Sequence, residues 1–281
     1  MSWPRRLIRI FVLAIITLVT TFACLVGCMV VKQDEMIYMP RSYSSVDERQ
    51  FERDGLQELS FIQPAGNQTA YWLASRQGNP DPFIWLVFSG NGGCATDYLS
   101  LAQAGPATCG WLFVDYPGYG ACEGKPNPDS IRTNALGAAD ALALHLGKTP
   151  EDVRSRLGTF GHSIGSAVAL DSAVEMDLKQ VVLVAPFTTM KDMAANYVTP
   201  LFTFLLKHRF DNRATMKEFI GQGGHATIFH GAADNIIPSS MGRELATLGG
   251  GAATFIEVKG SGHNDIIARA ESEIAEALSP N

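Results

Sequence analysis

Short apolar runs alternate along the chain with longer segments whose apolar positions recur every three or four residues. Most of the runs are too uniformly apolar to face water on one side, which is typical of inner strands of a parallel sheet. They cover residues 83–88, 111–114, 156–160, 181–184, 227–229 and 254–258. Two earlier segments, 56–63 and 69–75, predict a pair of strands joined by a turn-rich Pro64-Ala65-Gly66-Asn67.

Helical patterns occupy the stretches between these strands. The pattern is strongest at 129–146, where Ile131, Ala135 and Ala138 share one face, and it recurs at 166–176 and 265–278. Alternating strands and helices predict an α/β fold with a doubly wound, mostly parallel sheet. In such a sheet the functional loops lie at the carboxyl ends of the strands.

One segment, residues 188–224, interrupts the alternation. We expect a small helical cap that lies over the sheet edge and walls an apolar pocket, with plain packing against the body as the alternative. Its apolar side chains are dense for a surface helix: Tyr197, Leu201, Phe202, Phe204, Leu205 and Leu206.

The N-terminus predicts a membrane-directed segment. Three arginines precede an uncharged, mostly apolar run over residues 10–31, and some 22 helical residues cross the roughly 30 Å hydrocarbon layer. Residues 1–27 are therefore a signal peptide or an anchor, 28–55 a polar linker, and 56–281 the folded domain. The arginines favour a cytoplasmic N-terminus, so we expect the domain on the far side of the membrane.

Leu25-Val26-Gly27-Cys28 resembles the bacterial lipobox, which makes Cys28 a candidate for lipidation. The sequence is compatible with a bacterial lipoprotein and, alternatively, with an uncleaved single-pass anchor. The net charge of −6 makes nucleic acid an improbable partner. The five cysteines have no metal-binding spacing, so no structural metal is expected.

Gly161-His162-Ser163-Ile164-Gly165 is a GxSxG pentapeptide between a predicted strand and a predicted helix. This is the pattern of a nucleophile elbow, in which a sharp turn raises the serine above the sheet. Two later strands are followed by the partners that an activated serine needs, Asp234 and then His263. We therefore predict Ser163 as nucleophile, His263 as base and Asp234 as its orienting acid. His162 is expected to point away from the nucleophile.

An oxyanion formed at such a serine needs two backbone N–H donors. Ile164 supplies one by its position after the nucleophile. The glycine-rich turn over residues 88–93 supplies the other, with Asn91 as first choice and Gly92 as second.

These motifs together resemble the α/β-hydrolase superfamily, and more narrowly its membrane-anchored serine hydrolases related to acyl-protein depalmitoylases and serine-aminopeptidase-like lipases. The resemblance also rests on Asp115-Tyr116-Pro117-Gly118-Tyr119-Gly120 and covers roughly residue 57 to the C-terminus. Two positions depart from it: Ser89 replaces the usual histidine of an HG pair, and Cys122 replaces a common serine.

The resemblance implies a cofactor-independent hydrolase of carboxylic esters, acting on acyl esters or thioesters of lipids or lipidated molecules. Two alternatives remain. The same three residues would serve a peptidase or amidase, and a catalytically silent envelope protein could use this fold to bind a partner.

Overall fold

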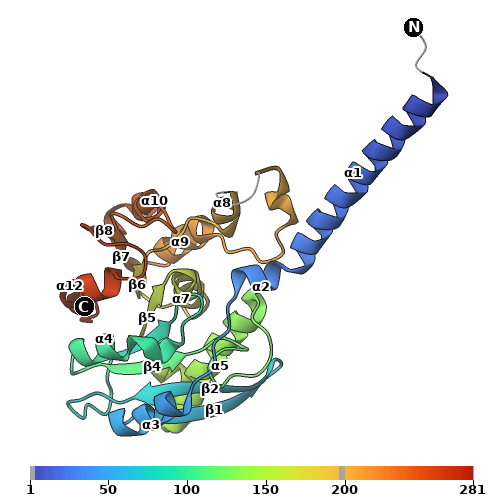
Figure 1. Ribbon diagram of the computed structural model, residues 1–281. Helices are drawn as coiled ribbons and strands as arrows, with labels where there is room; N and C mark the ends of the chain where they lie inside the picture. Colours follow the sequence, from blue (N-terminus) through green and yellow to red (C-terminus); the bar gives the residue numbers. More distant parts are fainter. Residues whose placement is uncertain (1–3, 196–199, 281) are drawn as a thin grey trace.

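The computed structural model describes residues 4–195 and 200–280. Its centre is an eight-stranded sheet with the order β1-β2-β4-β3-β5-β6-β7-β8 (Figure 1). The β1–β2 and β2–β4 pairs are antiparallel and all other pairs are parallel. The strands are β1 Gln57–Gln63, β2 Gly66–Leu73, β3 Ile84–Phe88, β4 Gly110–Val114, β5 Leu157–His162, β6 Gln180–Val184, β7 His225–Gly231 and β8 Ala253–Val258.

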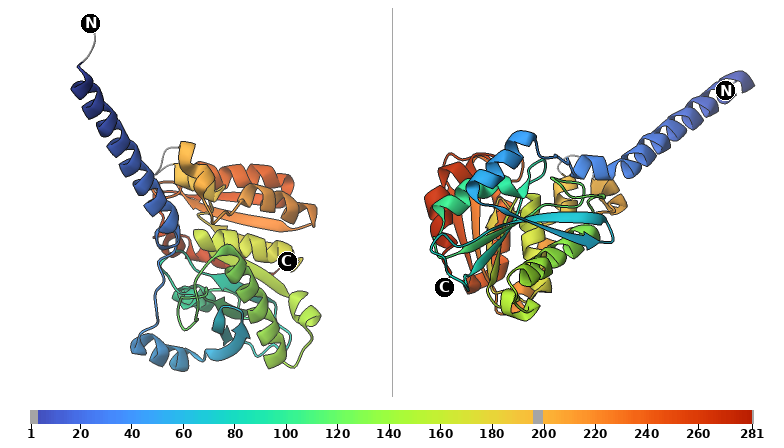
Figure 2. Two further views of the ribbon diagram at one scale, coloured as in Figure 1. Left: turned by 90° about the vertical axis from the view of Figure 1, so that its right-hand side faces the viewer. Right: turned by 90° about the horizontal axis from the view of Figure 1, so that it is seen from below.

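Helices cover both faces of this sheet (Figure 2). One face is packed by α5 (Pro128–His145), α6 (Pro150–Arg154), α7 (Ile164–Glu175), α9 (Asn212–Gly221) and α10 (Ser239–Gly249). The other is packed by α3 (Ser45–Asp54), α4 (Leu99–Ala104), α11 (Ile266–Arg269) and α12 (Glu271–Ala277), while short 3₁₀ turns lie at η1 (Ala95–Tyr98) and η3 (Gly250–Ala252). Because the inner strands are buried on both faces, their side chains are apolar on both.

The predicted fold class is thus confirmed, and each strand lies where an apolar run or hairpin predicts it. The last helix differs from the prediction of one continuous element at 265–278. The chain bends at Ala270 (φ −119°, ψ 26°), which divides α11 from α12. Ile266 on α11 and Ile274 on α12 both pack into the core below the sheet.

The N-terminal segment forms a 27-residue helix, α1 (Arg5–Val31), which projects away from the domain (Figure 1). None of its described residues is buried, and it is long and apolar enough to cross a membrane. Two short elements follow, α2 (Gln33–Ile37) and α3. Within the expected linker at 28–55, Tyr38 and Phe51 are buried and belong to the core.

The segment expected to form a cap has two parts. α8 (Met190–Ala195) and η2 (Pro200–Leu205) lie near the end of α1, whereas α9 packs against α7 and α10 in the body of the domain (Figure 1). Of the apolar residues named for this segment, Tyr197 lies outside the described residues, as do the side chains of Leu201 and Phe202.

Helix α7 begins directly against the end of β3. A Cβ atom at Gly165 would lie 2.4 Å from the carbonyl oxygen of Phe88 and 2.5 Å from that of Ser89, closer than any real contact. Glycine at this position therefore allows the first turn of α7 to approach the sheet.

We expect Gly165→Ala to lower the free energy of unfolding by about 2 kcal/mol or more, because rigid backbone must shift to admit the methyl group. Gly221→Ala is the matched control: Gly221 also lies in a helix, but its added Cβ would meet open space. This substitution should raise stability by about 0.4–1 kcal/mol. Urea unfolding of both variants measures the difference, and equal effects would contradict the close packing of α7 on β3.

Candidate active site

Ser163 lies at the sharp turn between β5 and α7. Its backbone has φ 57° and ψ −120°, a conformation that residues other than glycine rarely adopt. The turn is held by the Ser163 N–H, which donates to the Val184 carbonyl at 2.9 Å. A Cβ at Gly161 would lie 2.0 Å from the Gly165 carbonyl oxygen, so the turn needs glycine on both sides. This is the geometry of a nucleophile elbow.

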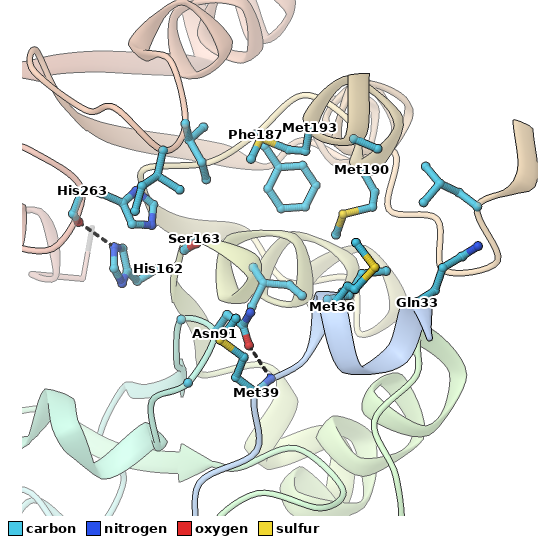
Figure 3. Close-up of a pocket in the computed structure, with 18 of the residues that line it drawn as sticks. Gln33, Met36, Met39, Asn91, His162, Ser163, Phe187, Met190, Met193 and His263 are labelled. Carbon is cyan, nitrogen blue, oxygen red and sulfur yellow. Dashed lines mark hydrogen bonds between the residues drawn. The ribbon is translucent and has the colours of Figure 1, made fainter. Parts of the chain in front are cut away.

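Asp234 and His263 form a pair beside this turn. Asp234 follows β7 and His263 follows β8, and the Asp234 carboxylate accepts a hydrogen bond from His263 Nδ1 at 2.7 Å. His263 and Ser163 line the same cavity (Figure 3). No hydrogen bond joins the Ser163 hydroxyl to the ring among the described contacts, a looseness common in unliganded sites.

The surroundings of Asp234 keep its carboxylate charged. Burial by itself would raise the pKa of Asp234, but hydrogen bonds from His230, His263 and the N–H groups of Ile237 and Ile236 outweigh burial and hold the pKa well below its usual range. The Ile236 and Ile237 N–H groups donate to Oδ1 at 2.9 and 2.8 Å, which leaves Oδ2 for His263. The carboxylate can therefore fix the ring orientation of His263.

The loop that carries His263 is itself held by Asp265. Asp265 Oδ1 accepts hydrogen bonds from the Gly262 N–H at 2.7 Å and from the Ser261 hydroxyl at 3.0 Å. A histidine on a mobile loop would not stay aligned with its partners. In the Gly-Ser-Gly-His-Asn-Asp sequence over residues 260–265, Asp265 thus holds the loop in the shape that aligns His263 with Asp234.

Ile164 and Asn91 each present a backbone N–H that has no acceptor in the described part of the chain. Ile164 opens α7, where N–H groups have no partner within the helix. In the turn after β3, the Gly90 N–H donates to Tyr98 and the Gly93 N–H to the Gly90 carbonyl. Asn91 is therefore a better placed donor than its neighbours.

Gly92 differs from Asn91 because its N–H faces Tyr119. The pKa of Tyr119 is raised to about 12 by burial, an effect that the N–H groups of Met39 and Gly92 partly oppose. The Asn91 side chain braces the turn: its oxygen accepts from the Met39 N–H at 2.8 Å (Figure 3). The same oxygen also accepts from the Tyr119 hydroxyl at 3.1 Å. This brace holds the backbone of Asn91 at the cavity that Ser163 also lines.

Ser89, the position at which the resemblance implies a histidine, also braces this turn. Its hydroxyl donates to the Gly93 carbonyl at 3.0 Å, and its own carbonyl accepts from the Tyr116 hydroxyl at 2.6 Å. Ser89 is buried. The departure from the family pattern thus keeps a polar group that closes the turn on itself.

A buried chain of hydrogen bonds joins the three functional loops. The Gly90 N–H donates to the Tyr98 hydroxyl at 3.1 Å, Tyr98 lies 2.9 Å from His162 Nδ1, and His162 Nε2 lies 3.1 Å from the His263 carbonyl oxygen. A carbonyl only accepts, so Nε2 carries the proton and Nδ1 accepts from Tyr98. His162 thus supports His263 through its backbone and does not face the nucleophile as a base.

Sequence reasoning missed this role of Tyr98 and His162. Tyr98 belongs to no motif and reaches His162 from a position 64 residues earlier in the chain. The signal available was weak: a tyrosine in a short segment directly after the glycine-rich turn. Only the fold brings η1 beneath the elbow.

The cavity at this site has a volume of about 840 Å³ and is mainly apolar. No aspartate, glutamate, lysine or arginine lines it within the described residues. One wall comes from the elbow and from the glycine-rich turn over residues 88–93, called here the oxyanion turn. The cap contributes Met190, Met193 and Leu205, and the N-terminal segment contributes Val30 and Met36 (Figure 3). Such a cavity suits an apolar group positioned next to Ser163.

Cys28, the candidate for lipidation, lies in the last turn of α1 and is exposed. It does not line the cavity, although Val26 and Met29 on either side of it in sequence do. A search of the described residues finds no cluster of three or more His, Cys, Asp or Glu that could hold a metal ion.

Comparison with known proteins agrees with the fold. Residues 85–222 match the sequence profile of the alpha/beta hydrolase family. An uncharacterized protein of Mycobacterium tuberculosis is 28% identical over 69% of this chain and 67% of its own length. The human alpha/beta hydrolase domain-containing protein 17B is 26% identical over 76% of this chain and 72% of its own length.

Solved structures agree at the level of the fold. The Pyrococcus furiosus esterase Pf2001 has a TM-score of 0.65 over 86% of this chain and 96% of its own, at 13% identity. The sheet, the elbow and these matches define a hydrolase fold. The chain belongs to the α/β-hydrolase superfamily.

We expect Tyr98→Phe to lower the free energy of unfolding by about 1–3 kcal/mol, because the Gly90 N–H and His162 Nδ1 both lose their buried partner. Chemical denaturation measures this change. A variant as stable as the parent protein would show that the Tyr98 hydroxyl holds neither loop.

We expect His162 to stay neutral down to about pH 4. Burial, reinforced by repulsion from His263, lowers the pKa of His162 from its usual 6.5 to about 4. The unfolded chain takes up the proton near pH 6.5, so the stability that His162 contributes is complete above that pH and is lost as the pH falls toward 4, by up to about 3 kcal/mol. NMR titration of the His162 ring checks this, and a midpoint near 6.5 would contradict it.

Proposed function

We propose that this protein is a serine hydrolase that cleaves carboxylic esters, with Ser163, His263 and Asp234 as its catalytic residues. The observation that carries the proposal is the 2.7 Å hydrogen bond between His263 and Asp234 in the loops beside a serine on a left-handed turn. A surface serine has no need of such a turn. Ser163, Ile164, Asn91 and His263 line one cavity, which supports their action on a single substrate carbonyl.

The reaction begins when the Ser163 hydroxyl attacks the ester carbonyl. His263 Nε2 takes the hydroxyl proton, and the Asp234 carboxylate stabilises the imidazolium that forms. The low pKa of Asp234 keeps it ionised during this step. Proton transfer of this kind accelerates reactions by about 10²–10⁴.

The tetrahedral intermediate places its negative oxygen between the N–H groups of Ile164 and Asn91. When this intermediate collapses, the imidazolium gives its proton to the departing alcohol and the acyl group remains on Ser163. Water, deprotonated by His263, then attacks the acyl-enzyme and releases the acid. Each donor at the oxyanion is worth about 10²–10³ in rate.

The cavity favours esters with an apolar acyl group over peptides or amides with charged side chains. No charged residue of the described chain lines the cavity, so a cationic or anionic substrate group would be desolvated there without a partner. A silent binding protein would have no physical need for a carboxylate-oriented histidine beside a buried glycine-flanked turn.

We further propose that α1 attaches the protein to a membrane with the catalytic domain outside the cytoplasm. Arg5, Arg6 and Arg9 precede the apolar stretch of this helix, and positive charge favours the cytoplasmic side. Lipidation at Cys28 and retention of α1 as an uncleaved anchor are both compatible with an exposed Cys28.

Ser163→Ala is expected to abolish labelling by a fluorophosphonate probe and to lower kcat for p-nitrophenyl butyrate by about 10³-fold or more. Ser240→Ala, an exposed serine on α10, is the matched control and should behave like the parent protein. Labelling and hydrolysis that persist in Ser163→Ala would assign the nucleophile elsewhere and overturn the proposal.

A further inference from the structure

Five methionines line the cavity from two opposite sides. Met29, Met36 and Met39 come from the N-terminal segment, whereas Met190 and Met193 come from α8 (Figure 3). Methionine side chains are flexible and polarizable, and they adapt to ligands that lack a fixed shape. A cavity of about 840 Å³ with such walls fits a long, flexible hydrocarbon chain better than a rigid ring.

The end of the membrane helix forms part of this wall. Val26, Met29 and Val30 on α1 and Gln33 on α2 line the cavity at intervals of three and four residues, which places them on one helical face. Val26 and Val30 are half-buried, while Val31 is 72% exposed and does not line the cavity. The same helix that would lie in the bilayer therefore reaches the substrate cavity.

Hydrogen bonds fix this helix end to the cap. The Gln33 amide donates to the Leu205 carbonyl at 2.8 Å, and its oxygen accepts from the Lys207 N–H at 2.8 Å. The next residue, Asp34, lies 2.9 Å from His208, whose other ring nitrogen lies 3.2 Å from the Tyr38 hydroxyl. These bonds hold α2, which is separated from α1 by one residue, against the cap and beside the cavity.

The depth of this wall in the membrane follows from the charges. Residues 10–31 carry no charge, and Lys32 is the first charged residue after them. Val26 and Val30 therefore lie on the hydrocarbon side of the boundary that Lys32 marks. Exposed apolar side chains surround this part of the domain: Met36, Met39, Phe204 and Ile236. They form a rim suited to contact with lipid.

We propose that the cavity takes its substrate directly from the bilayer. The substrate is an ester that resides in the membrane and carries a long acyl chain. The acyl chain of the substrate enters alongside α1 between Val30 and the cap and lies among the methionines. The ester carbonyl then reaches Ser163. This inference rests on the proposed esterase function and adds to it the substrate class and the route of entry.

The test compares two matched tryptophan substitutions in the full-length protein reconstituted in phospholipid vesicles. Val30→Trp fills the cavity wall, and Val31→Trp places the same side chain on the neighbouring exposed position. The substrates are p-nitrophenyl palmitate dissolved in the bilayer and water-soluble p-nitrophenyl butyrate. Each buried methylene contributes about fourfold to binding, so displacing even two should cost about tenfold or more.

We expect Val30→Trp to lower the ratio of palmitate to butyrate kcat/KM by about tenfold or more, and Val31→Trp to leave this ratio unchanged. Met193→Trp, which narrows the cavity from the cap, should lower the ratio in the same way. Equal ratios in Val30→Trp, Val31→Trp and the parent protein would overturn the inference.

A second measurement separates this inference from the proposed chemistry. A palmitic acid that carries a photoreactive diazirine is cross-linked to the Ser163→Ala variant in the same vesicles. Cross-links to residues 26–39, 190–194 or 203–206 that weaken with Val30→Trp and not with Val31→Trp support the acyl-chain site without any hydrolysis. Cross-links that neither substitution alters would contradict the acyl-chain site. A parent protein that cleaves neither ester would contradict the esterase assignment alone.

Discussion

The left-handed backbone at Ser163 is the constraint around which the site is arranged. A residue with a Cβ at φ 57° costs about 1–3 kcal/mol, and the structure offsets this cost with the Ser163 N–H bond to Val184 and the first turn of α7. The absence of side chains at Gly161 and Gly165 lets α7 begin against the backbone of β3 and β5. The Ile164 N–H and the Ser163 hydroxyl consequently face the same space.

Burial of His162 then separates the roles of two neighbouring imidazoles. Their ring centroids are 5.0 Å apart, so two positive charges there would repel each other. Burial keeps His162 neutral to about pH 4, and its two nitrogens are occupied by Tyr98 and the His263 carbonyl. This leaves His263, whose Nδ1 bonds to the ionised Asp234, as the proposed base with no cationic ring beside it. His162 can act as a support because it stays neutral above about pH 4.

The sequence predicts the sheet well because its inner strands are buried on both faces, which makes them readable as apolar runs. The elbow, Asp234 and His263 were likewise predictable, since each follows a strand in a short motif. The contributions of Gln33, Tyr38 and Tyr98 were not, because their partners other than Gly90 lie 64 to 174 residues away and their local sequence is polar or unremarkable. Local periodicity carries no signal for a contact that only the folded sheet creates.

The contacts of α2 also change how the N-terminal helix must be understood. A tether that only holds a domain near a membrane needs a flexible link, and a flexible link would leave the orientation of the active site free. Here Gln33 bonds to two backbone groups of the cap, and Met39 bonds to the oxyanion turn through Asn91. α2, which is separated from α1 by one residue, cannot move relative to the domain without breaking bonds that shape the cavity. In the proposed membrane attachment, the same few hydrogen bonds therefore hold the start of the domain and the shape of the site.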